Sequence, residues 1–161
     1  MMQTTTDQAR KEDEMVLEVT EENILQAAEI RSRSWKDAHR DFCGEAFVET
    51  HTTEQQKEYL EKELLDGKRV YMLEHESAVG IVSIKGNLIE NLYILPEEQH
   101  KGYGTELLEF AIGQCGEVST LWVLSNNKKA YSLYTKRGFQ TTGNRRMLSD
   151  EISEIEMILR E

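Results

Sequence analysis

The stretch Gln99-His100-Lys101-Gly102-Tyr103-Gly104 decides the fold, because it joins a predicted strand to a predicted helix. The apolar run over residues 88–95 indicates the strand, and Pro96 ends it. The apolar periodicity over residues 105–115 indicates the helix. A glycine-rich turn at a helix start presents unpaired backbone N–H groups and the positive end of the helix dipole. This stretch, which we name the glycine loop, is therefore predicted to bind phosphate groups.

Two familiar phosphate-binding loops do not match the glycine loop. A P-loop needs Gly-x4-Gly-Lys-Ser/Thr, and a dinucleotide fingerprint needs a third glycine at the position that Leu107 occupies. The pattern that remains is Gln-x-x-Gly-x-Gly between a strand and a helix. A tight strand-to-helix turn without any ligand produces the same hexapeptide, so the loop alone leaves both interpretations open.

The composition predicts one globular domain with an acidic surface. The chain has 161 residues, of which 39% are hydrophobic and 30% charged, and this balance is typical of a single soluble domain. The formal net charge of −11 argues against binding of nucleic acid, which needs clustered lysine and arginine. An acidic surface favours cationic substrates such as amines, although it also serves solubility alone.

The sequence gives no sign of a membrane segment, a signal peptide or a metal site. No apolar run approaches the roughly 18 residues of a membrane span, and the start, Met1-Met2-Gln3-Thr4, is polar. Cys43 and Cys115 fit neither a disulfide framework nor a metal site, and the four histidines are scattered. We therefore expect a cytoplasmic protein without a bound metal, in which Cys115 is a reduced core residue.

The patterning along the chain predicts a mixed α/β (α+β) domain. Residues 1–14 are expected to form a loose tail, 15–161 the domain, and 41–52 a loop. Thr20 and the pair Thr53 and Gln56 are candidate helix caps. The consecutive apolar residues 121–124 indicate a strand buried on both faces. Strands are expected at 15–19, 70–74, 78–85, 88–95, 119–124, 139–142 and 152–159, and helices at 24–39, 53–66, 105–115 and 127–137.

A second motif follows the glycine loop after one predicted strand. Asn127-Lys128-Lys129-Ala130, Leu133-Tyr134 and Gly138-Phe139 match the pattern Asn-x-x-Ala-x-x-Leu-Tyr-x3-Gly-Phe. With the glycine loop and the preceding Leu92-Tyr93-Ile94-Leu95-Pro96-Glu97, this motif resembles the GNAT N-acetyltransferase superfamily. The resemblance covers residues 70–140, about half of the chain. It implies a GNAT-like mixed, mostly antiparallel central sheet of about seven strands flanked by about four helices.

The resemblance implies that acetyl-coenzyme A is the co-substrate. The pantetheine arm would pair with the backbone at Leu92, Tyr93 and Ile94, and the side chain of Asn127 would bond the same arm. As a residue, Asn127 is equally readable as a helix N-cap. The pyrophosphate would lie on the backbone N–H groups of Gln99, His100, Lys101, Gly102, Tyr103, Gly104 and Thr105.

Tyr134 corresponds to the family's usual proton donor to the departing thiolate. A model tyrosine has a pKa of about 10 and a thiol about 8.5, so this transfer is uphill by roughly 2 kcal/mol in an unperturbed site. The hydroxyl would then act largely as a hydrogen-bond donor to the charge that develops on sulfur. From residue chemistry alone, Tyr134 is also readable as a core aromatic.

Glu90 is the candidate general base. An amine with a pKa of about 10.4 is almost entirely protonated at neutral pH, and only its neutral form attacks a thioester. Two-residue alternation places Glu90 on one face of its strand with Leu92 and Ile94. Desolvation there would make the carboxylate a stronger base. A salt-bridged or solvent-facing glutamate is the alternative interpretation, and Glu154 and Glu156 are weaker candidates for the base.

The amine acceptor is expected to contact the first helices, their connecting loop and the final strands. A backbone N–H near Ile94 or Leu95 would stabilise the oxyanion. Neither cysteine lies in the motif region as a nucleophile, so the amine would attack directly. Residues that could line the acceptor site are Trp35, His39, Phe42, Tyr71 and Arg146.

These features together indicate an acetyl-CoA-dependent N-acetyltransferase that acts on a primary amine of a small molecule or a peptide. Two alternatives stay open. One is a non-catalytic acyl-CoA-binding sensor or scaffold module, and the other is transfer of a different acyl group, such as succinyl. Members of the family are often dimers, so a homodimer is one expected state, although no residue pattern here fixes the oligomeric state.

Overall fold

The computed structural model describes residues 14–41 and 44–161. Most of the predicted tail, residues 1–13, lies outside the described residues, as do Phe42 and Cys43. The strands are β1 (Glu14–Glu18), β2 (Arg69–His75), β3 (Ser77–Lys85), β4 (Leu88–Ile94), β5 (Val118–Leu124), β6 (Gln140–Met147) and β7 (Ser153–Arg160). The helices are α2 (Ile24–His39), α3 (Glu45–Glu49), α4 (Thr53–Leu65), α5 (Tyr103–Cys115), α6 (Lys128–Arg137) and the 3-10 helix η1 (Pro96–Glu98).

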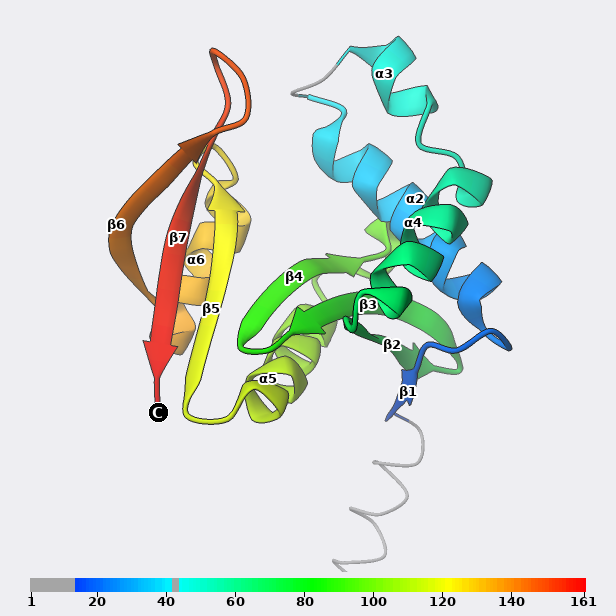
Figure 1. Cartoon of the computed structure of the whole chain (residues 1–161), viewed down its shortest axis with the longest axis horizontal. Coiled ribbons are helices and arrows are strands. Elements are labelled where there is room, and N and C mark those ends of the chain that lie inside the picture. Colours follow the sequence, from blue (N-terminus) through cyan, green and yellow to red (C-terminus); the bar gives the residue numbers. More distant parts are fainter. Residues whose placement is uncertain (1–13, 42–43) are drawn as a thin grey trace, which may run out of the picture. The chain divides into compact units, whose positions relative to one another are not determined.

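The predicted mixed sheet of seven strands is confirmed, with the strand order β1-β2-β3-β4-β5-β7-β6 (Figure 1). The pairs β1 with β2, β5 with β7 and β6 with β7 are antiparallel, whereas β4 and β5 are parallel. Five α-helices lie within residues 14–41 and 44–161, against about four predicted.

The additional helix, α3, lies in a segment that was predicted to be a loop. It has five residues, and Val48 is its only buried side chain. A segment this short cannot show helical periodicity in the sequence, and an isolated helix of one turn is not stable in water. Its formation therefore depends on tertiary contacts, which the sequence pattern does not reveal.

The chain forms two compact units. The first comprises the described residues up to Ser83 together with Asn91–Leu107, and the second comprises Ile84–Glu90 together with Leu108–Glu161. The glycine loop belongs to the first unit, and the Asn127 to Phe139 motif belongs to the second.

The core of the first unit forms between the helix pair α2 and α4 and the strands β2 and β3. The two helices pack against each other, as Figure 1 shows. Ala27, Leu60, Met72 and Ile81 are fully buried members of this core. Arg31 on α2 also joins α4 through two hydrogen bonds of 2.8 and 2.9 Å to the carboxylate of Glu63.

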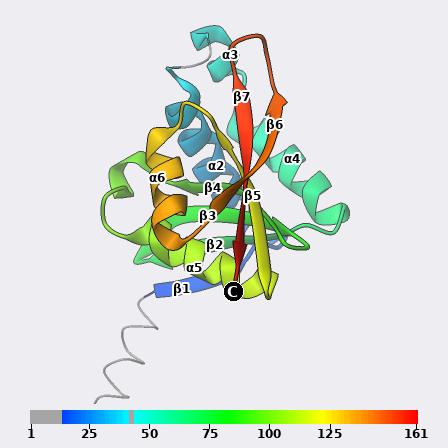
Figure 2. The same cartoon turned by 90° about the vertical axis from the view of Figure 1, so that its left-hand side faces the viewer.

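The second unit contains the antiparallel strands β5, β7 and β6 with α6 beside them (Figure 2). Its largest fully buried side chains include Leu121, Phe139 and Met157. The prediction that β5 is buried on both faces is wrong, because burial alternates along the strand. Leu121 and Val123 are buried, whereas Trp122 and Leu124 are half-buried on the opposite face. Cys115 is also half-buried, so it is not the core residue that was predicted.

The edge strand β6 is twice as long as predicted, and all eight of its residues are exposed. Its register against β7 shifts between Thr141 and Arg145, around Gly143. The polar sequence Gly143-Asn144-Arg145-Arg146 is typical of a loop, which explains why the strand was predicted to end at residue 142. Pairing with β7, the next strand along the chain, extends β6 to Met147.

The helix caps differ from the prediction by one residue or more. The side chain of Thr52, not Thr53, accepts a hydrogen bond of 3.1 Å from the backbone N–H of Gln55 at the start of α4. Thr20 does not cap α2, which begins at Ile24 after Asn23. From the sequence alone, either threonine of the pair Thr52-Thr53 could be the N-cap. The backbone conformation decides which of the two caps the helix.

Replacing Thr52 by alanine is expected to lower the free energy of unfolding by about 1 kcal/mol, because α4 loses its side-chain cap. The matched variant Thr53→Ala removes a hydroxyl from the first helical position and is expected to cost less. Urea denaturation of both variants measures the difference. An equal or larger loss in Thr53→Ala would contradict the assignment of the cap.

Candidate active site

Strand β4 carries the first group of candidate residues, and its regular geometry is interrupted at Asn91. This residue has a φ of 54°, in the left-handed region that is uncommon for residues with a side chain. The parallel register of β4 with β5 joins Leu88 to Thr120 and Ile89 to Leu121, before this point. A left-handed residue within a strand redirects the side chains that follow it. The predicted common face of Glu90, Leu92 and Ile94 therefore does not continue uninterrupted through Asn91.

The connection from β4 to the glycine loop is tightly held by backbone and side-chain hydrogen bonds. The buried Leu95 donates its backbone N–H to the Val79 carbonyl at 2.9 Å. This N–H is therefore occupied, so of the two backbone N–H groups that were expected to stabilise an oxyanion, that of Leu95 is already engaged. Pro96 begins η1, which the sequence analysis missed. Beyond it, the side-chain amide of Gln99 donates to the Ile94 carbonyl at 3.2 Å.

The glycine loop itself uses two left-handed residues, His100 with a φ of 67° and Gly102 with a φ of 88°. Helix α5 then begins at Tyr103, two residues earlier than predicted, so Gly102 is the last residue before the helix. Gly102 and Thr105 are exposed, and Gly104 is half-buried within the first turn. The ring of Tyr103 is only 9% exposed and lies 5.5 Å from the ring of His75.

Two ion pairs surround the glycine loop. Arg33 on α2 contacts the carboxylate of Glu97 at 2.5 Å, and Lys101 contacts that of Glu98 at 3.0 Å. A backbone hydrogen bond at Glu97, together with Arg33, holds the pKa of Glu97 below its ordinary value. The hydrogen bond from Lys101 to Glu98 raises the pKa of Lys101 above its ordinary value. Lys101 therefore stays cationic at neutral pH beside the exposed loop.

Asn127 occupies the N-cap position of α6. Its side-chain oxygen accepts a hydrogen bond of 3.1 Å from the backbone N–H of Ala130. The N-cap interpretation of Asn127 is therefore confirmed. This bond uses the side-chain oxygen only, so it does not exclude a second interaction of the side-chain NH2 group.

Tyr134 lies two turns further along α6 and is 8% exposed. Its ring packs edge-to-face against Phe139, with the centroids 5.9 Å apart. Glu90, half-buried in β4, belongs to the same unit of the chain as Tyr134. Of the two predicted catalytic residues, Glu90 is thus half-buried and Tyr134 is buried. Their catalytic roles stay a prediction.

Three of the described residues of the first unit were candidates to line the acceptor site. Trp35 is stacked between the rings of His39 and His51, at centroid distances of 4.0 and 3.5 Å. Both faces of the indole are therefore covered by side chains of the protein itself. Tyr71 is half-buried on β2, opposite Glu18 of β1. The structure thus brings Trp35 and His39 together, whereas Tyr71 lies on a different element.

Arg146, the acceptor-site candidate in the second unit, lies on β6. Its guanidinium group lies 4.2 Å from the ring centroid of Trp122 and 2.6 Å from the carboxylate of Glu154. The contact with Trp122 was not predicted, because β5 was expected to be buried on both faces. Glu156 accepts hydrogen bonds of 2.9 Å from Thr142 and from Asn144. Of the two weaker candidates for the base, Glu154 is therefore paired with a cation, whereas Glu156 is bonded to neutral donors.

Within residues 14–41 and 44–161, no three or more histidine, cysteine, aspartate or glutamate residues gather as a group that could hold a metal ion. Nor does any helix in that part of the chain have the length and apolar character that crossing a bilayer requires.

The chain belongs to the GNAT acetyltransferase family. The family model described as an acetyltransferase (GNAT) domain matches residues 8–161. This match includes the glycine loop and the Asn127 to Phe139 motif, on which the predicted resemblance rested. No curated protein is significantly similar in sequence.

Solved structures of low sequence identity share the fold. The PaiA N-acetyltransferase from Thermoplasma acidophilum, in complex with coenzyme A, is 22% identical, with a TM-score of 0.72 over 92% of this chain and 99% of that chain. YncA from Salmonella typhimurium, with its cofactor acetyl-CoA, is 19% identical, with a TM-score of 0.66 over 92% and 94%. A ribosomal-protein-alanine N-acetyltransferase from Brucella melitensis is 19% identical, with a TM-score of 0.65 over 91% and 99%.

Proposed function

We propose that this protein is a cytoplasmic enzyme that transfers an acetyl group from acetyl-coenzyme A to a primary amine by direct attack. Membership of the acetyltransferase family supports the reaction class. The structures of PaiA with coenzyme A and of YncA with acetyl-CoA support the choice of co-substrate. The observation that carries the proposal is the glycine loop, which opens α5 with Gly102 in a left-handed conformation.

The glycine loop fits a pyrophosphate group. A Cβ atom at Gly102 would meet nothing within 4 Å, so the space beside this backbone is open to a ligand. Helix α5 has 13 residues, long enough for its N-terminal N–H groups and its dipole to attract an anion. Lys101, a residue of the loop, contributes an ammonium group that is paired with Glu98. The backbone N–H groups of residues 100–105 would therefore hold the pyrophosphate, because the N–H of Gln99 donates to the Pro96 carbonyl.

The pantetheine arm would be held by backbone and side-chain amides. The backbone of Leu92, Tyr93 and Ile94 follows the interruption of β4 at Asn91, and it would pair with the arm as a strand does. The side-chain oxygen of Asn127 already caps α6, which leaves its NH2 group to donate to a carbonyl oxygen of the arm. The cap would then orient Asn127 for this second bond.

Acetyl-coenzyme A supplies a thioester, so a carbon–nitrogen bond to the amine forms as the carbon–sulfur bond breaks. Glu90 would accept the proton that the amine loses, directly or through a water molecule. Tyr134 would donate to the departing sulfur atom. The N–H of Leu95 is engaged by Val79, so the N–H of Ile94 is the remaining candidate to stabilise the oxyanion.

Acetyl-coenzyme A is expected to raise the melting temperature of the protein by roughly 5–10 °C at about 100 times its dissociation constant. Binding to the native state alone adds about 2.7 kcal/mol under that condition. The variant Gly104→Val is expected to lose the shift, because a branched side chain would stand in the first turn of α5. The matched variant Gly113→Val lies on the same helix, at an exposed position with open space, and should keep the shift.

The measurement is thermal unfolding of the three proteins with and without acetyl-coenzyme A. No shift in the wild type would leave the glycine loop as a turn without a ligand and would overturn the proposal. Release of free thiol with a panel of amines then separates an enzyme from a non-catalytic acyl-CoA sensor, and the same assay with succinyl-coenzyme A tests the choice of acyl group.

A further inference from the structure

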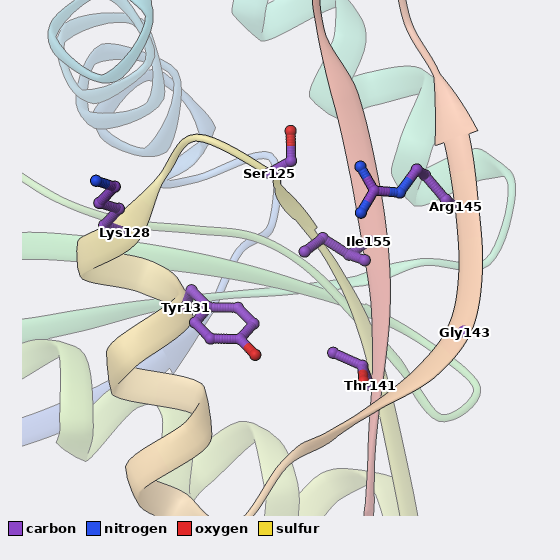
Figure 3. Close-up of a pocket in the computed structure, with 7 residues that line it drawn as sticks. All are labelled: Ser125, Lys128, Tyr131, Thr141, Gly143, Arg145 and Ile155. Atoms are coloured by element: carbon purple, nitrogen blue, oxygen red, sulfur yellow. The ribbon is translucent and has the colours of Figure 1, made fainter.

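The second unit contains a cavity of 390 Å³ between α6 and the strands β6 and β7, and none of its lining residues is one that was assigned above to acetyl transfer. The cavity forms on the sheet face where Arg145 pairs with Ile155, the face opposite Arg146 and Glu154. The register of β6 against β7 shifts between Thr141 and Arg145, and Figure 3 shows the ribbon of β6 curving past Gly143 beside the cavity. The lining residues are Ser125, Lys128, Tyr131, Thr141, Gly143, Arg145 and Ile155.

The charge of this cavity is opposite to that of the chain as a whole. Its lining contains two basic residues and no acidic residue, whereas the chain carries a net charge of −11. In Figure 3 the guanidinium group of Arg145 points toward Ser125 and Ile155, whereas the ammonium group of Lys128 points away from them. A single side-chain cation, that of Arg145, is therefore directed into the cavity.

Hydrogen bonds hold Arg145 in place without neutralising it. Its Nη1 donates to the hydroxyl of Ser153 at 3.2 Å, and Ser153 in turn donates to the hydroxyl of Ser125 at 2.9 Å. Within the described part of the chain, Arg145 has no carboxylate partner. The fork formed by its Nε and Nη2 atoms remains to donate to a ligand.

Two further donors and an apolar surface complete the cavity. Within the described residues, the hydroxyl groups of Tyr131 and Thr141 have no hydrogen-bond partner. Figure 3 shows the Tyr131 hydroxyl directed toward the side of the cavity where Thr141 lies. The ring of Tyr131 and the side chain of Ile155 provide apolar contact area.

We propose that this cavity binds a small organic carboxylate. A guanidinium fork matches the two oxygens of a carboxylate, and one cation balances one negative charge. The hydroxyl groups of Tyr131 and Thr141 supply additional donors, and Ile155 contacts the apolar part of the ligand. A phosphate dianion would lack a second cation here, because Lys128 is directed elsewhere.

The test is titration of the full chain with benzoate, followed by calorimetry and by the backbone amide NMR signals of Gly143 and Arg145. Benzoate is expected to shift these signals and to bind at least about tenfold more tightly than the neutral benzamide, because only the carboxylate engages the guanidinium. Arg145→Gln is expected to weaken benzoate binding by about 10- to 100-fold. Arg160→Gln removes the same charge outside the cavity, and Lys128→Gln removes the cation that points away, so both should bind benzoate as the wild type does.

Thr141→Val is a second variant that keeps the charge and the shape, and it should weaken benzoate binding less than Arg145→Gln. Equal affinity for benzoate and benzamide, tighter binding of inorganic phosphate than of benzoate, or no binding of benzoate up to about 10 mM would each overturn the proposal. Competition between benzoate and acetyl-coenzyme A would also overturn it, because the cavity would then belong to the co-substrate.

Discussion

Replacing Tyr134 by phenylalanine is expected to lower kcat by about 100-fold or more, because the departing sulfur atom loses its donor. The KM for acetyl-coenzyme A is expected to change little, since the hydroxyl would interact with charge that develops only in the transition state. The measurement is steady-state release of thiol with an amine that the wild type accepts. A loss confined to KM would point to a binding role for the hydroxyl instead.

The packing around Tyr134 makes this variant a clean test. The ring is 8% exposed and packs against Phe139, and phenylalanine preserves that contact. The melting temperature should therefore stay close to that of the wild type. Tyr59→Phe, on the partly exposed face of α4, removes a hydroxyl outside the proposed site and should leave kcat unchanged. Unchanged turnover in Tyr134→Phe would remove this residue from the mechanism.

The parts of the site that could be predicted from the sequence are those specified by local chemistry. Gly102 adopts a left-handed conformation directly before α5, and a glycine close before a periodic run is the residue type that such a turn favours. Asn127 and Gly138 likewise mark the two ends of α6, where Asn127 is the N-cap and Gly138 is the left-handed C-cap. These signals lie within a few residues of the structure that they specify, so a single sequence is enough to read them.

The parts that could not be predicted depend on contacts between separate segments of the chain. The length of β6 is set by pairing with β7, and its own sequence, rich in polar residues, resembles a loop. The cavity lined by Arg145 lies where that strand shifts its register against β7. Likewise, Trp35 was a candidate contact for the acceptor, but His51, 16 residues later, covers one face of its ring.

Asn91 shows how one backbone angle limits a prediction from periodicity. Strict alternation along β4 would have fixed the face of Glu90 relative to the residues that follow it. The left-handed φ at Asn91 interrupts that alternation directly after Glu90. Asparagine is among the residues that tolerate this conformation best, but within an apolar run it gives no reliable signal of its own. The role of Glu90 therefore has to be tested by its chemistry and not by its position in the pattern.

Replacing Glu90 by glutamine is expected to lower kcat/KM by about 100-fold or more at neutral pH, because glutamine has the shape of glutamate but cannot accept a proton. Without a base, the rate depends on the fraction of amine that is neutral in solution. That fraction rises about tenfold per pH unit below the pKa of the amine, so the defect of the variant should shrink steadily as the pH is raised. The pH profile of kcat/KM for both proteins, with one amine, measures this.

The Glu90→Gln experiment has a matched control variant, and Glu156 is the alternative candidate for the base. Glu117→Gln removes an exposed carboxylate between α5 and β5 and should leave the profile unchanged. If the loss of kcat/KM in Glu90→Gln is the same at every pH, Glu90 has a positioning role. If the variant has the same pH profile of kcat/KM as the wild type, Glu90 is excluded as the base. Glu156 would then be the next residue to test, because its hydrogen bonds come from Thr142 and Asn144, whereas Arg146 neutralises Glu154.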